Sequence, residues 1–312
     1  MIFAWILPFA VCVRTIPAFA HIAWRVARLH SSLLSRLTSR IPFPCAECLC
    51  IALCAALVCA PKLRKYILLW LLAGYFVLWY PAYRMPVTDV PALNAEELYS
   101  VCAALISDAE VIPECVPLEQ IVRECNVKLA RFPEWMRFCR LAGIFIPHTA
   151  EVILSPDFDA YAAAFTACHE LQHAAGIADE GEANLRAYAV CMEKGGIYAF
   201  SAKLWHLQYS MQKLHQADAD AWCNLRDSMS PALYAIFQNS IHGFSEAEYA
   251  DNLLFRFLGI ADAVRDYDRL AYQKQPDRIV AAMRRDGTAY PYHVQMLQSH
   301  ALAHNFRKYF HQ

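Results

Sequence analysis

The stretch His169-Glu170-Leu171-Gln172-His173 has the spacing HExxH, and it decides which fold is expected around it. Residues four apart on an α-helix lie one turn above each other on the same face, so both imidazoles can bind one metal ion. Zinc is the metal that such a pair favours. Glu170 is placed to take a proton from a zinc-bound water, whose pKa the metal lowers toward neutrality. The motif predicts a helix that carries the zinc site of a metallopeptidase.

The residues on both sides of the motif predict where its helix begins and ends. Asp159 can cap a helix that runs through Phe165 into the motif. Gly176 can end the helix soon after the second histidine. A turn at this point brings the chain back toward the metal, where a third protein ligand is needed.

Glu182 is the predicted third ligand. The sequence Asp179-Glu180-Gly181-Glu182 follows the motif helix, and Glu182 falls in the first turn of a second predicted helix. Its carboxylate would complete a His2Glu set and leave the fourth position to water. Alternatively, Asp179 and Glu182 form a capping box, in which Glu182 only satisfies a backbone N–H. Glu180 is the next candidate ligand. The predicted zinc ligands are therefore His169, His173 and Glu182, with Glu170 as general base.

The composition indicates that the front of the chain lies in a membrane. Hydrophobic residues make up 58% of the chain, charged residues 18%, and the mean hydropathy is +0.24. This is too apolar for an ordinary cytosolic domain. Apolar stretches predict three transmembrane helices at about residues 2–24, 41–60 and 66–83, which form a membrane anchor over residues 1–85. The first stretch also resembles a signal peptide, but it has no basic n-region and Arg14 interrupts its apolar core.

Basic residues give conflicting signals for the orientation in a bacterial cell membrane. Lys62, Arg64 and Lys65 lie in the turn between the second and third spans, which favours a cytoplasmic turn and an extracytoplasmic second domain. The loop between the first two spans would then be outside, yet it carries Arg25, Arg28, Arg36 and Arg40. Their amphipathic spacing allows this loop to lie in the interface, with the arginines reaching the headgroups. We expect a multi-pass protein whose second domain is extracytoplasmic.

Residues 86–312 are long enough for one domain with its own core, and the pattern is mainly helical. Helices are predicted at about residues 94–107, 118–130 and 190–214. One segment, residues 151–154, is extended and forms an edge strand before the motif helix, where an extended peptide can pair. A net charge of −1 gives no basic footprint for nucleic acid.

Other polar residues are weaker candidates. His148 and Glu151 could line the cleft, although a loop histidine beside proline is more often at the surface. Tyr198 and Tyr209 could donate hydrogen bonds to an oxyanion, although such tyrosines are more often core residues. The thirteen cysteines follow no zinc-finger or disulfide spacing, which favours buried free thiols.

The motif and its neighbours resemble a known family. The resemblance rests on residues 144–151, 165–173 and 176–184, on the aromatic-rich segment 79–84, and on residues 249–267. These stretches are similar to a bacterial family of multi-pass membrane HExxH proteins, catalogued as domain of unknown function 3810. The similarity covers the chain up to about residue 272, and it departs from the family pattern at residues 150–153 and at Gln172.

The resemblance implies a zincin-like peptidase domain. It assigns His169, His173 and Glu182 as zinc ligands and Glu170 as the base, and it implies a peptide or protein substrate. The expected fold is mainly α, with N-terminal transmembrane helices followed by a mostly helical, zincin-like domain over residues 86–312 that has a short β edge.

Two classes of function remain open from the sequence. The first is a membrane-anchored zinc metallopeptidase that hydrolyses peptide bonds with zinc-activated water. The second is a non-catalytic membrane sensor or scaffold with a structural zinc site. Glu170 favours the first, because a structural site needs no base at that position. An intramembrane protease is less expected, because the motif lies some 85 residues after the last predicted span and has acidic neighbours.

Overall fold

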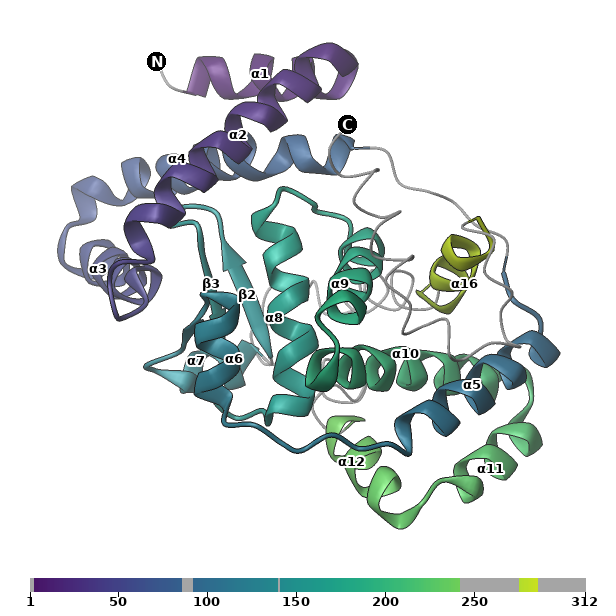
Figure 1. The fold of residues 1–312 in the computed structure, drawn as a ribbon. Helices are drawn as coiled ribbons and strands as arrows, with labels where there is room; N and C mark the ends of the chain where they lie inside the picture. The colour runs from purple at the N-terminus through teal and green to yellow at the C-terminus, as the bar shows by residue number, and fades with distance from the viewer. Residues whose placement is uncertain (1–2, 86–91, 140, 242–274, 286–312) are drawn as a thin grey trace.

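The computed structural model describes residues 3–85, 92–139, 141–241 and 275–285 (Figure 1). These residues are mostly helical and include one small β-sheet, which confirms the prediction of a mainly α chain. The segment at residues 249–267 and the histidines His242, His293, His300, His304 and His311 lie outside the described residues.

The first two helices form a bent pair. α1 (Phe3–Thr15) and α2 (Pro17–Thr38) meet at 116°. The bend lies at Ile16, which is extended because the ring of Pro17 disfavours helical backbone in the preceding residue. The span predicted at residues 2–24 is therefore split between two helices that point in different directions.

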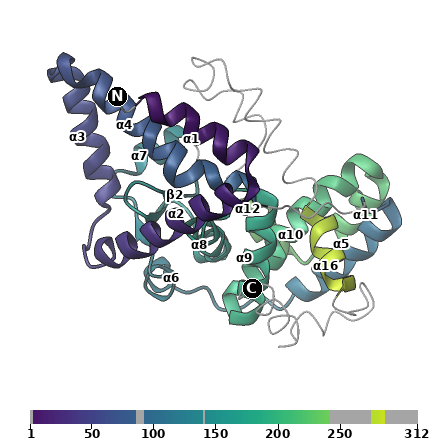
Figure 2. The same ribbon diagram turned by 90° about the horizontal axis from the view of Figure 1, so that it is seen from above.

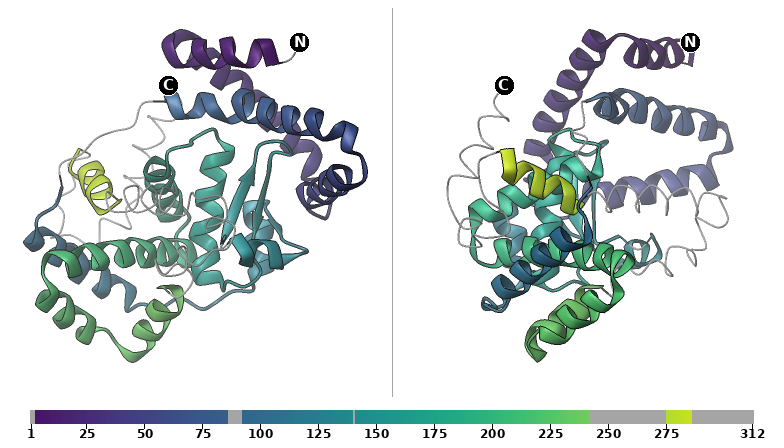
Figure 3. Two further views of the ribbon diagram at one scale, coloured as in Figure 1. Left: turned by 180° about the vertical axis from the view of Figure 1, so that it is seen from behind. Right: turned by 90° about the vertical axis from the view of Figure 1, so that its right-hand side faces the viewer.

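α3 (Cys45–Cys59) and a second helical run form a hairpin whose tip projects away from the sheet and from α8 (Figures 2 and 3). The second run comprises the 3-10 turn η1 (Pro61–Leu63), α4 (Arg64–Gly74), the π-helical η2 (Tyr75–Trp79) and the 3-10 turn η3 (Tyr80–Arg84). At 24 residues, this run is long and apolar enough to cross a membrane.

The structure supports one or two of the three predicted spans. Among the described residues, one helix can cross a membrane, or two if the bent α1–α2 pair is a broken span. α3 has 15 residues, and at about 1.5 Å per residue it is shorter than the roughly 30 Å hydrocarbon core. Residues 41–44 of the predicted second span precede this helix rather than extending it.

Glu47 attaches the hairpin to the second domain. Its side chain leaves the first turn of α3 and is 5% exposed. The carboxylate accepts hydrogen bonds from the backbone amides of Arg131 (3.0 Å) and Phe132 (3.3 Å) and from the indole of Trp135 (2.8 Å). Three donors satisfy this buried carboxylate, so the start of α3 is fixed to the loop before α7 (Pro133–Cys139).

Glu151 makes the reciprocal attachment from the second domain. Its buried carboxylate accepts from the backbone amides of Cys45 (2.9 Å) and Ala46 (2.7 Å), the first two residues of α3. It also binds the Lys128 ammonium at 2.5 Å. The free amides and the dipole at a helix N-terminus favour such an anion. Glu151 therefore caps α3, and this role replaces the predicted one of lining the cleft.

The sheet has three strands in the order β1-β3-β2. β1 (Lys128–Leu129) is parallel to β3 (Glu151–Leu154), and β2 (Gly143–Ile146) is antiparallel to it. The prediction of one extended segment identified β3 but was wrong about its place, because β3 is the central strand and all four of its residues are buried. β2 has a free edge.

Two predicted helix boundaries also differ. α6 (Leu118–Cys125) ends at Asn126, which has φ 52° and stops the helix before the expected residue 130. The run predicted over residues 190–214 is broken between α9 (Glu180–Lys194) and α10 (Gly196–Ala217). Gly195 and Gly196 have φ of 71° and 52° at the break, where glycine is favoured.

α8 (Ala160–Ala174) is the central helix of the domain (Figure 1). One side packs on β2 and β3, and the other packs on α9 and α10. Ala164, Ala167 and Cys168 are fully buried, and their small size lets the neighbouring elements approach closely. α5 (Ala95–Ala109), α11 (Ala219–Ser228) and α12 (Pro231–Ile241) extend the core beyond α10. The predicted start of α5 is confirmed by a capping box between Asn94 and Glu97.

The last described helix, α16 (Gln275–Arg285), packs against α9 and α10. Asp277 accepts a hydrogen bond from the Leu93 amide (2.7 Å) and binds the Lys213 ammonium (2.5 Å). These contacts hold α16 beside the start of α9, which carries a site residue.

Candidate metal centre

The HExxH motif occupies the last two turns of α8, as the sequence predicts. The Asp159 side chain accepts from the Ala162 amide and caps the start of the helix. Gly176, with φ 88°, follows its end. His169 and His173 are one turn apart and buried, and their Nε2 atoms are 3.0 Å apart. The two imidazoles therefore converge on one point beside the helix.

Glu180 brings a carboxylate to the same point. Its Oε2 atom lies 3.1 Å from Nε2 of His169 and 3.4 Å from Nε2 of His173. Among the residues that the structure describes, these three form a group of potential metal ligands. One ligand atom from each residue lies within 4.8 Å of those of the other two. The geometry is that of a three-ligand site built from the end of α8 and the start of α9.

The structure does not bring Glu182 to the histidine pair. The Glu182 carboxylate binds Arg186 Nε at 2.7 Å, one turn further along α9. The Glu182 backbone amide donates to the side chain of Asp179 at 2.8 Å, which is one half of a capping box. Because Asp179 caps α9, Glu180 is its first residue and faces α8. Glu180, the second choice from the sequence, therefore occupies the position expected of Glu182.

Hydrogen bonds orient the side chains of the site. Nδ1 of His173 donates to the Ile177 carbonyl at 2.7 Å, which leaves Nε2 to face Glu180. Burial lowers the pKa of His173, but the hydrogen bond and charge of Glu180 outweigh it and raise that pKa to about 9. Burial opposes ionisation of Glu180, yet its two histidine neighbours hold its pKa well below the usual range. His173 and Glu180 therefore favour opposite charges at the site.

Glu170 is buried next to the free edge of β2. The Ser155 amide donates to the Ala142 carbonyl, so this pair is hydrogen bonded across the two strands. Hydrogen-bonded and non-hydrogen-bonded pairs alternate along an antiparallel ladder, so the backbone groups of Gly143 and Phe145 point away from β3. The Phe145 amide hydrogen bonds to Glu170. A Cβ at Gly143 would lie 2.8 Å from Cγ of Glu170, so only glycine fits there. Burial raises the pKa of Glu170, and this effect outweighs the charges of the two histidines, which lower it.

A further layer of contacts supports the start of α9. Arg278 of α16 binds Asp179, the residue that caps α9, at 2.7 Å. Its guanidinium lies where a side chain at Gly181 would be, so Gly181 leaves room for this contact. Arg278 is buried. It therefore fixes the turn that presents Glu180.

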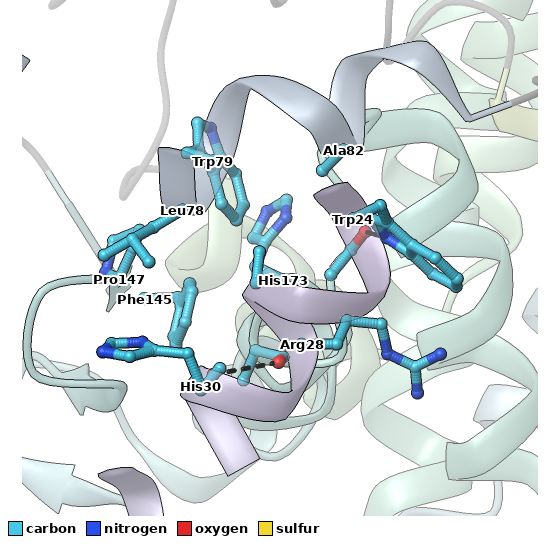
Figure 4. Close-up of a pocket in the computed structure, with 13 residues that line it drawn as sticks. Trp24, Arg28, His30, Leu78, Trp79, Ala82, Phe145, Pro147 and His173 are labelled. Atoms are coloured by element: carbon cyan, nitrogen blue, oxygen red, sulfur yellow. Dashed lines mark hydrogen bonds between the residues drawn. The ribbon is translucent and has the colours of Figure 1, made fainter. Parts of the chain in front are cut away.

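Aromatic residues from the N-terminal helices cover His173. In Figure 4, the His173 ring lies between Trp79 of η2 and Trp24 of α2. The Trp79 ring meets the His173 ring edge to face, with centroids 5.7 Å apart, and also contacts Phe145. The Trp24 indole donates to the Gly176 carbonyl at 2.7 Å. The site is thus covered by helices more than 90 residues away in the sequence.

The other predicted site residues lie elsewhere. His148 packs against Gly74 and stacks on Trp70 of the hairpin, with ring centroids 4.7 Å apart. The Tyr198 hydroxyl donates to Glu124 at 2.7 Å. Tyr209 packs against Trp205, with centroids 5.7 Å apart.

Sequence reasoning missed Trp79, Trp24, Phe145 and Arg278 as residues of the site. Local spacing gives no signal for any of them. The apolar helices in which the two tryptophans lie could be recognised, but not the surface on which these helices pack.

Comparisons with known proteins bear on the region around the site. No curated protein and no solved structure matches the chain. A family model described as protein of unknown function (DUF3810) matches residues 115–258, a stretch that begins after the N-terminal helices and includes the HExxH motif and Glu180. Residues 115–258 are therefore similar to this uncharacterised family.

Proposed function

We propose that the protein is a membrane-anchored zinc metallopeptidase. The observation that carries the proposal is the convergence of His169, His173 and Glu180, with the buried carboxylate of Glu170 one residue from the first histidine. In this proposal the two histidines and Glu180 bind zinc, and Glu170 is the general base. This is a His2Glu donor set with a separate carboxylate for proton transfer.

The distances between the ligand atoms suit zinc. Tetrahedral coordination at roughly 2.0–2.1 Å from the metal separates two ligand atoms by about 3.3 Å. The three separations among His169, His173 and Glu180 are 3.0, 3.1 and 3.4 Å. The set can therefore accept a tetrahedral ion with small movements, and three protein ligands leave a fourth position for water.

The residues around the ion have distinct tasks in this proposal. Zinc held by His169, His173 and Glu180 would supply a bound water whose pKa is low enough for attack on a peptide carbonyl near neutral pH. Glu170 takes the proton from this water and gives it to the nitrogen of the departing amine. Burial of Glu170 raises its pKa, which makes its protonated form more accessible for the second transfer. The bond from His173 to the Ile177 carbonyl keeps that imidazole correctly turned.

The free edge of β2 supports a peptide as substrate. The outward backbone groups of Gly143 and the outward carbonyl of Phe145 are suited to bind an extended chain by strand addition, while the Phe145 amide binds Glu170. This edge lies beside Glu170, so a paired chain would run past the base. Trp79 contacts both Phe145 and His173, and it must move aside for a substrate to enter.

The membrane orientation is a separate part of the proposal. The hairpin tip carries Lys62, Arg64 and Lys65, which favours a cytoplasmic tip. The base of the hairpin contacts the metal centre through Trp79, so the domain would be extracytoplasmic. Labelling of intact cells at a single cysteine placed at Gln275, in a variant without the native cysteines, tests this. Labelling only after permeabilisation would contradict it.

The function is tested with the full-length chain purified in detergent. We expect about one zinc per chain by elemental analysis and cleavage of a peptide library that stops on chelation and returns with added zinc. Zinc bound at this ratio without cleavage of any peptide or protein would favour a structural zinc site in a sensor or scaffold.

A further inference from the structure

The 22 residues of α2 divide into three faces. Ala20, Ala23 and Ala27 are buried on one face, and Thr38 continues it. From this face the Trp24 indole donates to the Gly176 carbonyl, and the Ser31 hydroxyl donates to the Ala174 carbonyl at 3.4 Å. One side of α2 thus lies directly on the turn that follows His173.

A second face of α2 is apolar and exposed. Its residues recur every three or four positions, which places them in one stripe along the helix. They are Ile22, Val26, Leu29, Leu33 and Leu37, and each is between 53% and 60% exposed. Five large aliphatic side chains in one uncovered stripe indicate contact with something apolar rather than with water.

The third face of α2 is basic. With 3.6 residues per turn, Arg25, Arg28 and Arg36 fall along one side of the apolar stripe. The Arg28 guanidinium lies over the Trp24 ring, 4.7 Å from its centroid. Within the described chain, Arg25 and Arg36 have no ion-pair partner. α2 contains no acidic residue.

The charges of the surrounding region extend this pattern. Residues 1–88 contain nine lysines and arginines and one acidic residue, Glu47, so their net charge is +8. The whole chain has a net charge of −1, which leaves −9 for residues 89–312. A strongly basic region with an exposed apolar stripe is complementary to an anionic lipid surface.

The position of α2 fits such a surface. α2 packs on η2 and η3, at the base of the hairpin whose tip projects away from the domain (Figure 3). It crosses α4 rather than running beside it (Figures 1 and 3), so α2 and α4 cannot both stand along the bilayer normal. Of the 24 large hydrophobic residues that are exposed among those described, 20 lie before residue 85, so the stripe belongs to a larger apolar surface.

We propose that α2 lies along the surface of an anionic phospholipid bilayer, with its apolar stripe among the upper acyl chains and its arginines at the lipid phosphates. The opposite face of α2 holds the turn after His173, so the metal centre lies about one helix diameter, roughly 10 Å, from the lipid. This inference does not depend on catalysis, and it holds for a structural metal site as well.

The test uses the full-length chain in phospholipid vesicles. A fluorescent amino acid is placed singly at Ile22, Leu29 or Leu37, and its quenching by lipids brominated at shallow or deep acyl positions is measured. We expect the same shallow depth at all three positions. A depth that changes steadily from Ile22 to Leu37 would show a spanning helix, and absence of quenching would show contact with water or protein. Either result would overturn the inference.

The charge component is tested with a photocrosslinking amino acid at Leu33, in vesicles that contain phosphatidylglycerol and phosphatidylcholine. We expect phosphatidylglycerol adducts to exceed their share of the bulk lipid by about fivefold. The double variant Arg25→Gln and Arg36→Gln should bring the adduct ratio close to the bulk ratio. The matched control is Arg123→Gln with Arg226→Gln, outside α2, and should leave the preference intact. Equal preference in both double variants would contradict a role for these arginines.

Discussion

The Trp79 ring of the apolar hairpin meets the His173 ring of the HExxH helix edge to face, with centroids 5.7 Å apart. The helical run that carries Trp79 is long and apolar enough to cross a membrane, and His173 is a proposed zinc ligand. The candidate metal centre is therefore covered by the apolar hairpin. Movement of the hairpin and access to the metal should be coupled.

We predict that Trp79→Ala speeds the removal of zinc by a soluble chelator. The substitution opens the cover over His173 without removing a ligand, so the rate should rise while the zinc affinity changes little. Trp70→Ala is the matched control, because Trp70 lies on the same helical run but stacks on His148. Equal rates in both variants, measured by stopped-flow fluorescence of the chelator, would contradict the covering role.

The third ligand is tested by comparing two glutamates that are two residues apart. Loss of a group that only orients a ligand weakens metal binding by roughly 10- to 100-fold, so loss of a ligand should cost more. Glu180→Gln should therefore lower the zinc affinity by more than about 100-fold. Glu182→Gln should change it little, because that carboxylate binds Arg186. Competition titration with a chelator measures both affinities, and the reverse order would restore Glu182 as the ligand.

The contact between Arg278 and Asp179 should influence the metal site from a distance. Arg278→Met keeps the bulk of the side chain but removes the bond to the residue that caps α9. We expect zinc affinity to fall by about tenfold, the lower end of the range for supporting residues. Arg226→Met on α11 is the control, since Arg226 pairs with the exposed Asp227. An unchanged affinity in Arg278→Met would show that the turn is held without α16.

Glu47 should hold the hairpin on the second domain. Glu47→Gln turns an amide toward a site with three N–H donors, and hydrogen bonds to a charged group contribute about 1.5–3 kcal/mol each. We expect faster hydrogen exchange at the amides of Arg131 and Phe132, by at least about tenfold. Glu134→Gln serves as control because its side chain is 75% exposed. Unchanged exchange in Glu47→Gln would mean that other contacts fix α3.

Local patterns predicted the parts of the site that lie on α8. The HExxH spacing, the cap at Asp159 and the turn at Gly176 are properties of neighbouring residues, and the structure confirms these helix limits. The choice between Glu180 and Glu182 depends on how α9 is aimed at α8. Either residue fits the first turn of a helix, so the sequence pattern could not decide between them.

Long-range packing explains what the sequence did not reveal. β1 has only two residues, too few to show an alternating pattern. Hydropathy identified apolar segments near the N-terminus but not the bend before Pro17 or the shortness of α3. Glu151 looked like a cleft residue because it precedes the motif helix, whereas its partners Cys45 and Ala46 lie more than 100 positions away.

The most direct test of the central claim is Glu170→Gln in the full-length chain, with zinc content and peptide hydrolysis measured on the same preparation. Glu170 is not a ligand, so the variant should retain zinc and fold. It should lose hydrolysis by several orders of magnitude, because both proton transfers depend on this carboxylate. Glu182→Gln should retain both properties. A Glu170→Gln protein that loses its zinc, or that cleaves the same peptides at the wild-type rate, would contradict the metallopeptidase assignment.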